Sequence, residues 1–294
     1  MQKKKELRIL KAAITRTLVY QSIFDSVPSL EQLTKLLVSH RTFSVDRIMR
    51  AIEDSDEISI REGYVFLPVD KELLLRTVQR NMWSLGKIQF AKRYLKILSK
   101  VPWVRMIGIS GSVASFNATE DDDIDLFIIT AAKRIWLART VDWLLLNLFR
   151  VRRNASSTDV KNKLCINYYL AEDQLGLKNR DIFTANEIAR LIPIHDKGVY
   201  NHFINSNSWG KNHLGNFWKD FQMNNADLQC PLPRFRFIPI DWIEFVLAKV
   251  EKRYMMPKMT KEHVNQHEVR FHPKDARQRV LKEYEKRLEA KGLV

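Results

Sequence analysis

The spacing of apolar residues along the chain predicts helices at its start. Four of them recur at intervals of three and four and predict a first helix over about 5–22: Leu7, Leu10, Ile14 and Leu18. The segment "SLEQ" at 29–32 has the pattern of a capping box, in which Ser29 and Gln32 begin a second helix. Ser44 is expected to cap a third. Two short β-prone runs on either side of Gly63 then predict a hairpin.

Three helices followed by a hairpin are typical of a winged helix, a variant of the helix-turn-helix. We therefore predict a winged-helix-like domain over residues 1–70. Its third helix would offer Arg47 and Arg50 to a DNA groove. Two arginines are few for a protein that recognises DNA sequence. Winged helices also dock proteins, so the pattern alone does not separate the two uses.

A long connecting helix is predicted over 71–100, and its charge is one-sided. Residues 76–105 contain eight Lys and Arg and no Asp or Glu. Like charges along one helix repel each other unless an anion lies nearby, so we expect nucleic acid to contact residues 76–105. The alternative is an ordinary solvated face, although such faces normally mix both signs.

An α/β core is predicted over residues 101–180. "VRMIGI" at 104–109 is a continuous apolar run, which is typical of a buried strand. Further strands are expected at 123–130 and 163–171, with a helix over about 132–150 between them. Strands and helices that alternate in this order predict a single small mixed sheet.

The remaining residues, 181–294, are expected to form a helical C-terminal domain. Thr184 followed by Glu187 has the spacing of a helix cap, and "CPLPRFRFIP" at 230–239 is typical of a linker. Further helices are predicted at four places: about 196–205, 211–224, 239–255 and 275–291. The fold class is therefore α+β, with a winged-helix N-terminal domain, a mixed-sheet core and a helical C-terminal region.

Composition narrows the classes of partner. The chain of 294 residues has a formal net charge of +15, which favours an anionic partner such as nucleic acid or nucleotide phosphates. Its two cysteines exclude a disulfide framework and fit a reducing compartment. The N-terminus has no signal-peptide pattern, and the most apolar run, 135–149, is short and carries charges. We expect a cytoplasmic protein with no membrane partner.

Candidate chemistry is concentrated in "RMIGISGSVASFNATEDDDIDLFIIT" at 105–130. Asp123 and Asp125 are two positions apart on a predicted strand, so their side chains share one face. Two close carboxylates repel unless a cation lies between them, and Mg²⁺ prefers such oxygen ligands together with substrate phosphates. Gly111 and Ser112 form a turn into a helix, where backbone N–H groups can bind a phosphate. The alternative, an acidic loop, explains Asp121 and Asp122 but not an Asp enclosed by Ile124 and Leu126.

The motif formed by "IGISGS", a spacer and "DIDLFII" resembles the signature of the polymerase-beta-like nucleotidyltransferase superfamily. The resemblance covers about 30 residues. It implies transfer of a nucleoside monophosphate from an NTP to a hydroxyl acceptor such as RNA, with Mg²⁺ or Mn²⁺. It assigns phosphate binding to Gly111 and Ser112, and metal binding and catalysis to Asp123 and Asp125. The whole layout also resembles uncharacterised bacterial proteins that contain this domain.

The superfamily usually carries a third carboxylate on a later strand beside the Asp pair. The matching strand, 163–171, offers Asn167, which can coordinate a metal weakly but cannot act as a base. Glu172 and Asp173 lie just past the strand end and could substitute for the third carboxylate. If Asn167 alone occupies that place, a non-catalytic regulator that senses nucleotide or binds DNA becomes the alternative function.

Other residue clusters suggest no separate site. His263, His267 and His272 lack the Glu of a zinc-protease motif and have no nearby Cys, so we do not expect a zinc site. Trp209 and Trp218 are expected to anchor the core.

Overall fold

The protein is described from a computed structural model that covers residues 2–67, 71–154, 159–224, 240–255, 263–270 and 276–293. The predicted linker at 230–239 therefore lies outside the described residues. The helices are α1 (Gln2–Ser22), α2 (Leu30–Lys35), α3 (Val45–Glu53), α4 (Lys71–Leu98), α5 (Gly111–Ala114), α6 (Ile135–Leu148), α7 (Ile182–Arg190), α8 (Tyr200–Ser206), the 3₁₀ helix η1 (Ser208–Asn212), α9 (Gly215–Asn224), α10 (Asp241–Met255) and α11 (Ala276–Glu289). The strands are β1 (Ser59–Arg61), β2 (Tyr64–Phe66), β3 (Val104–Ile109), β4 (Ile124–Thr130), β5 (Leu164–Ala171), β6 (Ile192–Asp196), β7 (His263–Val264) and β8 (Glu268–Arg270). The predicted α+β class is confirmed.

The first 67 residues form three helices and a hairpin in the predicted order. Both hydrogen bonds of the capping box at Ser29 and Gln32 are present. Ser44 is at the N-cap of α3, but its side chain makes no cap hydrogen bond. Gly63 is one of two left-handed residues in the β1–β2 turn, with φ of 79°, and Glu62 before it has φ of 52°. The elements fit the pattern of a winged helix, and that assignment remains a prediction.

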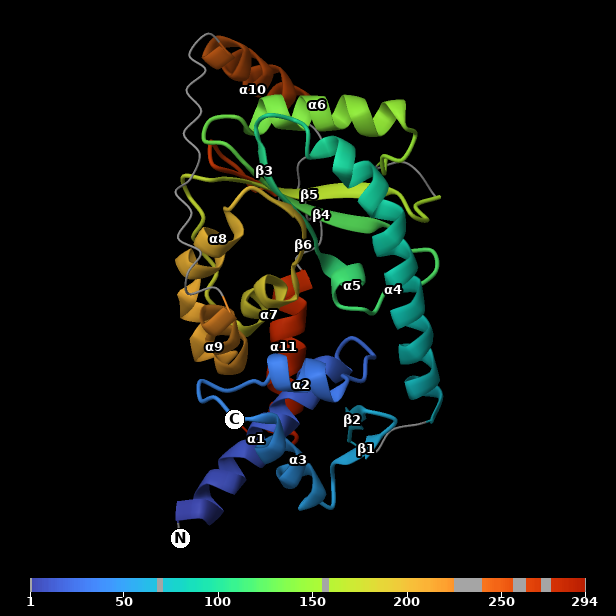
Figure 1. The fold of residues 1–294 in the computed structure, drawn as a ribbon, viewed down its shortest axis with the longest axis vertical. Helices are drawn as coiled ribbons and strands as arrows, with labels where there is room; N and C mark the ends of the chain where they lie inside the picture. Colours follow the sequence, from blue (N-terminus) through green and yellow to red (C-terminus); the bar gives the residue numbers. More distant parts are fainter. Residues whose placement is uncertain are drawn as a thin grey trace.

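A mixed sheet forms the centre of the molecule (Figure 1). The strand order is β6-β3-β4-β5-β8-β7. Among these described strands only β4 and β5 pair in parallel, and the connection through α6 is the long crossover that parallel strands need. The predicted strands β3, β4 and β5 are its three central members.

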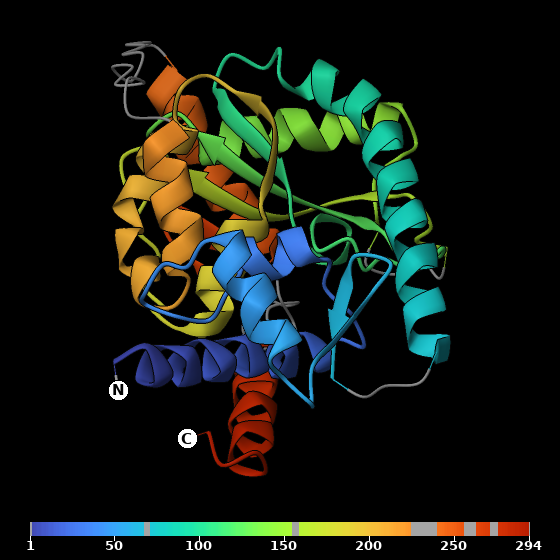
Figure 2. The ribbon, with the colours of Figure 1, turned by 60° about the horizontal axis from the view of Figure 1, so that its bottom comes forward.

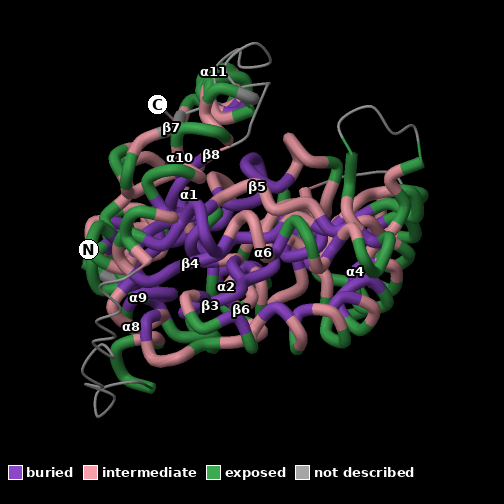
Figure 3. Tube along the Cα trace, turned by 90° about the horizontal axis from the view of Figure 1, so that it is seen from above, coloured by how far each residue is buried: buried purple, intermediate pink, exposed green. Residues whose placement is uncertain are grey.

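Two hydrophobic clusters cover the two faces of this sheet. Along β4, Ile124, Leu126 and Ile128 pack with α4 and α6, whereas Phe127 and Ile129 pack with α1, α7 and α8. Strands β3 and β4 are the most continuously buried strands of the sheet (Figure 3). Because side chains alternate between faces, Asp125 belongs to the same face as Phe127.

The C-terminal region is less helical than predicted. Helices α8 to α11 are found near their expected positions, but residues 192–196 and 263–270 form strands. Strand β6 pairs with β3 at one side of the sheet, and β8 pairs with β5 at the other. The predicted helices after residue 181 are present, and three short strands that the sequence analysis did not predict complete the central sheet.

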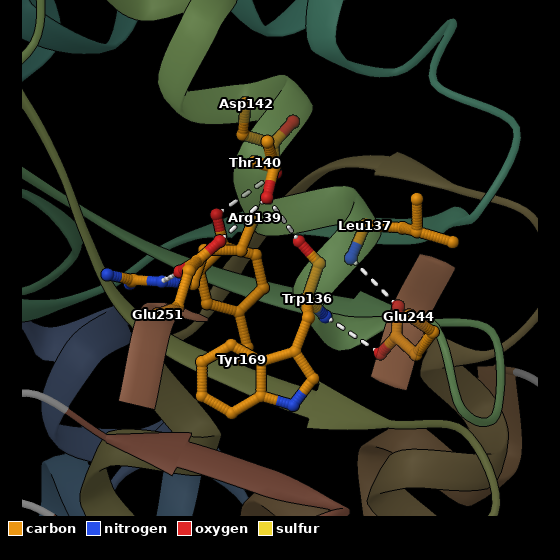
Figure 4. Close-up of polar contacts among 8 residues, drawn as sticks. All are labelled: Trp136, Leu137, Arg139, Thr140, Asp142, Tyr169, Glu244 and Glu251. Atoms are coloured by element: carbon orange, nitrogen blue, oxygen red, sulfur yellow. Dashed lines mark hydrogen bonds and ion pairs between the residues drawn. The ribbon is translucent and has the colours of Figure 1, made fainter. Parts of the chain in front are cut away.

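Acidic side chains fix α10 to α6 (Figure 4). The two carboxylate oxygens of Glu244 accept hydrogen bonds of 2.9 Å from the N–H groups of Trp136 and Leu137, in the first turn of α6. Glu251 accepts a 2.7 Å bond from the Thr140 hydroxyl and also pairs with Arg139. Helix α6 is thus capped by a residue more than 100 positions away.

The C-terminal helix ties the N-terminal unit to the core. Helix α11 crosses α1 (Figure 2), and the rings of Tyr20 and Tyr284 meet edge to face there. The Tyr284 hydroxyl donates to the Arg16 carbonyl, and the Arg287 guanidinium donates to the Ser22 hydroxyl. Helix α1 therefore belongs both to the N-terminal helices and to the core beside the sheet.

Candidate active site

Gly111 and Asp125 meet at one corner of the sheet. The Ser110 N–H donates to the Asp125 carbonyl at 2.9 Å, which brings the turn after β3 against β4. Gly111 has φ of 66°, and a Cβ at this position would lie 2.3 Å from the Asp125 carboxylate. Only glycine fits here, because the position requires both a left-handed backbone and space for the carboxylate. The structure thus places the predicted turn directly against the predicted Asp pair.

Ser112 is next to the pair but its hydroxyl is already engaged. It donates to the Asp122 carboxylate at 2.9 Å, and the same carboxylate accepts from the backbone N–H and the hydroxyl of Thr119. Asp122 was expected to be a solvated loop residue, which is wrong, because it fixes the loop between α5 and β4. A phosphate at this turn would therefore meet the backbone of Ser112 rather than its hydroxyl.

A bulge in β5 places polar side chains beside Asp125. Cys165 is the strand partner of Asp125, and the pairing then shifts so that Leu126 faces Ile166 but Phe127 faces Tyr168. The extra residue is Asn167, whose side-chain amide donates to the Asp125 carboxylate and accepts from the Cys165 thiol at 2.9 Å. Asn167 thus takes the place that the third carboxylate was expected to fill.

Glu172 and Asp173 do not reach the site. Glu172 forms a 2.8 Å ion pair with the buried guanidinium of Arg105, and its N–H donates to Thr130. Thr130 is at the far end of β4, roughly 16 Å of strand from Asp125. Asp173 pairs with His267 at 3.2 Å. The hypothesis that either acid replaces the third carboxylate is therefore wrong.

Arg153 is a site residue that the sequence analysis missed. Its guanidinium lies 2.6 Å from the Asp123 carboxylate, and it also approaches the Cys165 thiol. A cation thus compensates one carboxylate of the pair. No pattern in the sequence marks Arg153 as a site residue. It is one of several arginines in the loop after α6, and only the folding of the sheet brings it close to Asp123.

The carboxylates suit a divalent cation of the hard class. Among the described residues, Asp123, Asp125 and Cys165 each offer one potential ligand atom, and these atoms all lie within 4.8 Å of one another. Carboxylate oxygens suit Mg²⁺ and Mn²⁺, whereas a thiol suits softer ions. We therefore assign Asp123 and Asp125, rather than Cys165, as the residues that would hold such an ion.

Burial and the neighbouring carboxylate disfavour the charged form of Asp125. Desolvation, and then the charge of Asp123, raises the pKa of Asp125 to about 7. An uncompensated negative charge is thus costly at this corner. A positive ligand would relieve that cost, which is the behaviour expected of a cation site.

A cavity of about 540 Å³ opens beside the Gly111 turn, on the α7 side of the sheet. Gly111, Ser112, Asn167 and Glu187 are among the residues that line it. Thr184 was expected to cap α7, but Asp181 is the N-cap and its carboxylate accepts from the Thr184 N–H. Glu187 therefore has no capping role, and it is one of the residues that line the cavity.

Comparison of the chain with protein-family models, with curated proteins and with solved structures found no match. The likeness to nucleotidyltransferases therefore rests on the motif and on the geometry around it.

Three of the basic residues in 76–105 are used inside the protein. The Lys87 ammonium donates to the carbonyls of Glu120 and Asp122, Arg80 donates to Asn117, and Arg105 pairs with Glu172. These contacts explain part of the one-sided charge without nucleic acid. The other five side chains are exposed: Arg76, Lys92, Arg93, Lys96 and Lys100.

The remaining sequence candidates have structural roles or lie outside the described residues. Trp218 is buried and Trp209 packs against the same cluster, so both predicted anchors are confirmed. His263 and His267 belong to a strand hairpin rather than a helix, and His272 lies outside the described residues. Among the residues that the structure describes, no helix is long and apolar enough to cross a membrane.

Proposed function

We propose that the protein is a nucleotidyltransferase that uses Mg²⁺ or Mn²⁺ and moves a nucleoside monophosphate from an NTP to a hydroxyl acceptor. The observation that carries this proposal is the packing of Gly111 directly on Asp125, at the edge of a cavity. A triphosphate needs a close backbone approach and a metal held by carboxylates, and this corner offers both. The sequence motif alone could not supply that contact.

Each site residue would have a distinct role. Asp123 and Asp125 would hold the ion, which supplies charge neutralisation on the phosphates when it is bound. Gly111 leaves room for phosphate oxygens, and the backbone at Ser112 would orient them. Arg153 is positioned to bind phosphate once a metal compensates Asp123 in its place.

Transfer of label from α-labelled NTPs tests the proposal. We would incubate the full chain with each of the four NTPs, Mg²⁺ or Mn²⁺, and pools of RNA, protein and small-molecule acceptors. The double variant Asp123→Ala, Asp125→Ala is expected to lose all transfer and to keep its circular dichroism spectrum. Asp121→Ala is the matched control, since Asp121 is exposed in the same acidic loop. Equal labelling by the double variant would refute the assignment.

A non-catalytic regulator that senses nucleotide or binds DNA is the second candidate, and Asn167 favours it. An amide in place of a carboxylate binds metal weakly and accepts no proton. The DNA-binding form has less support, because Arg47 on α3 already pairs with Glu6 at 2.6 Å. Binding of NTP and metal without transfer to any acceptor pool would select the regulator.

A further inference from the structure

The cavity beside the candidate active site contains charges that nucleotide binding does not account for. Arg190 and Arg270 line it together with Glu187. Among the described residues, neither guanidinium forms an ion pair with a carboxylate within 4 Å, although Arg190 is hydrogen-bonded to Asn186. Arg277, which also lines the cavity, is different because it is paired with Asp181 at 2.6 Å.

Glu187 interacts electrostatically with Asp125 and with Arg190 and Arg270. Its neighbours on α7, Asn186 and Ile188, are buried, whereas Glu187 remains accessible from the cavity. The cavity wall therefore carries both carboxylates and guanidiniums.

Aromatic side chains form part of the rest of the wall. Phe127 and Tyr168 come from the sheet, Tyr20 comes from α1 and Phe183 comes from α7. The Arg270 guanidinium lies 5.7 Å from the centre of the Tyr168 ring. Aromatic walls with a few charged groups, in a volume of about 540 Å³, are typical of a site for one small molecule. A whole folded RNA or protein domain would not fit inside such a volume.

We propose that this cavity binds the acceptor, a small molecule with an apolar or aromatic body, an anionic phosphate or carboxylate group and a free hydroxyl. The anionic group would pair with Arg190 and Arg270, and the hydroxyl would lie near the Glu187 carboxylate. This inference rests on the proposed function and specifies its acceptor, which the sequence left open between RNA and smaller molecules.

The transfer step assigns Glu187 a role as well. The acceptor oxygen forms a bond to the α-phosphorus, and the bond from that phosphorus to the bridging oxygen of the β-phosphate breaks. Pyrophosphate leaves with those electrons, and the hydroxyl proton passes to the Glu187 carboxylate. Asn167 cannot accept that proton, so Glu187 would supply what the missing strand carboxylate does not.

Binding of simple anions tests the site without catalysis. Phenyl phosphate and benzoate are the probes, and benzyl alcohol is their neutral counterpart, each titrated into the full chain without metal or NTP by calorimetry. We expect at least one anion to bind and the alcohol not to bind. Arg190→Gln and Arg270→Gln should each weaken the anion at least tenfold, whereas Arg279→Gln, an exposed arginine of α11, should not. If Arg190→Gln fails to fold, Arg190→Lys, which keeps the charge, is titrated in its place.

Three outcomes would overturn the inference. In the first, neither anion binds the unaltered protein. In the second, the folded arginine variants bind the anion as well as the unaltered protein does. In the third, both variants weaken the binding of ATP with Mg²⁺ as strongly as the binding of phenyl phosphate. That result would mean that the arginines bind the nucleotide. Failure of the proposed function is distinguishable, since it appears as absent label transfer while anion binding still depends on Arg190 and Arg270.

Discussion

At the scale of single residues, Gly111 controls the geometry of the candidate site. Its missing side chain lets the turn rest on the Asp125 carboxylate, and its φ of 66° directs the chain into α5. Neighbouring Ser112 and Asp122 then lock the acidic loop in place. The three residues form one unit whose shape depends on the glycine.

Gly111→Ala is therefore expected to disrupt metal binding more than folding. The new Cβ would lie 2.3 Å from an Asp125 oxygen, so the carboxylate must move, and the left-handed backbone adds roughly 1–2 kcal/mol of destabilisation. We expect Mn²⁺ affinity, measured by calorimetry, to fall at least tenfold. Gly86→Ala is the control, because a Cβ there meets nothing within 4 Å. Unchanged Mn²⁺ binding by Gly111→Ala would contradict this account.

Asp142 predicts a pH dependence of stability that is independent of the site. It is buried on α6, with one oxygen bonded to the Tyr169 hydroxyl at 3.1 Å and the other without a hydrogen-bond partner among the described residues (Figure 4). Burial raises its pKa to about 7 from 3.8. The folded state thus holds the proton more tightly than the unfolded state, so stability from this residue is complete below pH 4 and is lost as pH rises through 7.

Asp142→Asn should remove that dependence. The free energy of unfolding of the variant, relative to the unaltered protein, is expected to increase by up to roughly 4 kcal/mol between pH 4 and pH 8. Urea denaturation at the two pH values measures this difference, and other titrating groups cancel in the comparison. A constant difference across the range would show that Asp142 is ionised in the folded state.

At the scale of elements, α6 depends on α10 for its start. Arg134 at its N-cap makes no side-chain cap hydrogen bond, and Glu244 supplies the missing acceptors for two first-turn N–H groups. A carboxylate at this end is also favoured by the helix dipole.

Glu244→Ala should therefore cost about 2 kcal/mol, since it leaves two buried N–H groups without their acceptor. The free energy of unfolding in urea measures this loss. Val250→Ala, at an exposed position of the same helix, should change stability by less than about 0.5 kcal/mol. Equal effects of the two substitutions would mean that α10 does not support α6.

The individual elements also show which parts of the fold and of the candidate site the sequence could predict. Strands β3, β4 and β5 are long apolar runs, so local pattern identified them, and with them the Gly111 turn and the Asp pair. Strand β6 contains Pro193 and β8 has three residues, so neither has a pattern distinguishable from a helix end or a loop. Glu187 and Arg153 enter the site through packing of distant elements, and the β5 bulge at Asn167 arises from pairing that local sequence does not encode.

At the scale of the whole molecule, the predicted N-terminal domain is part of a larger cooperative structure. The first part of α1 packs with α2 and α3, and its last part, including Tyr20, packs with the sheet, α7 and α11. Tyr20 also lines the cavity. The N-terminal helices therefore form one wall of the candidate site instead of a separate arm, and their folding is coupled to it.

We expect thermal unfolding in one transition, and Tyr284→Ala to lower the temperature of that whole transition. Tyr284 is buried against Tyr20 and bonded to the Arg16 carbonyl, so its truncation should cost about 3–5 kcal/mol. For a chain of this size that corresponds to a decrease of roughly 6–20 °C. Calorimetry measures the shift, with Glu285→Ala as the exposed control on the same helix. If the N-terminal helices folded independently, two transitions would appear and the substitution would leave one of them in place, whereas coupling through α1 requires both parts to melt together.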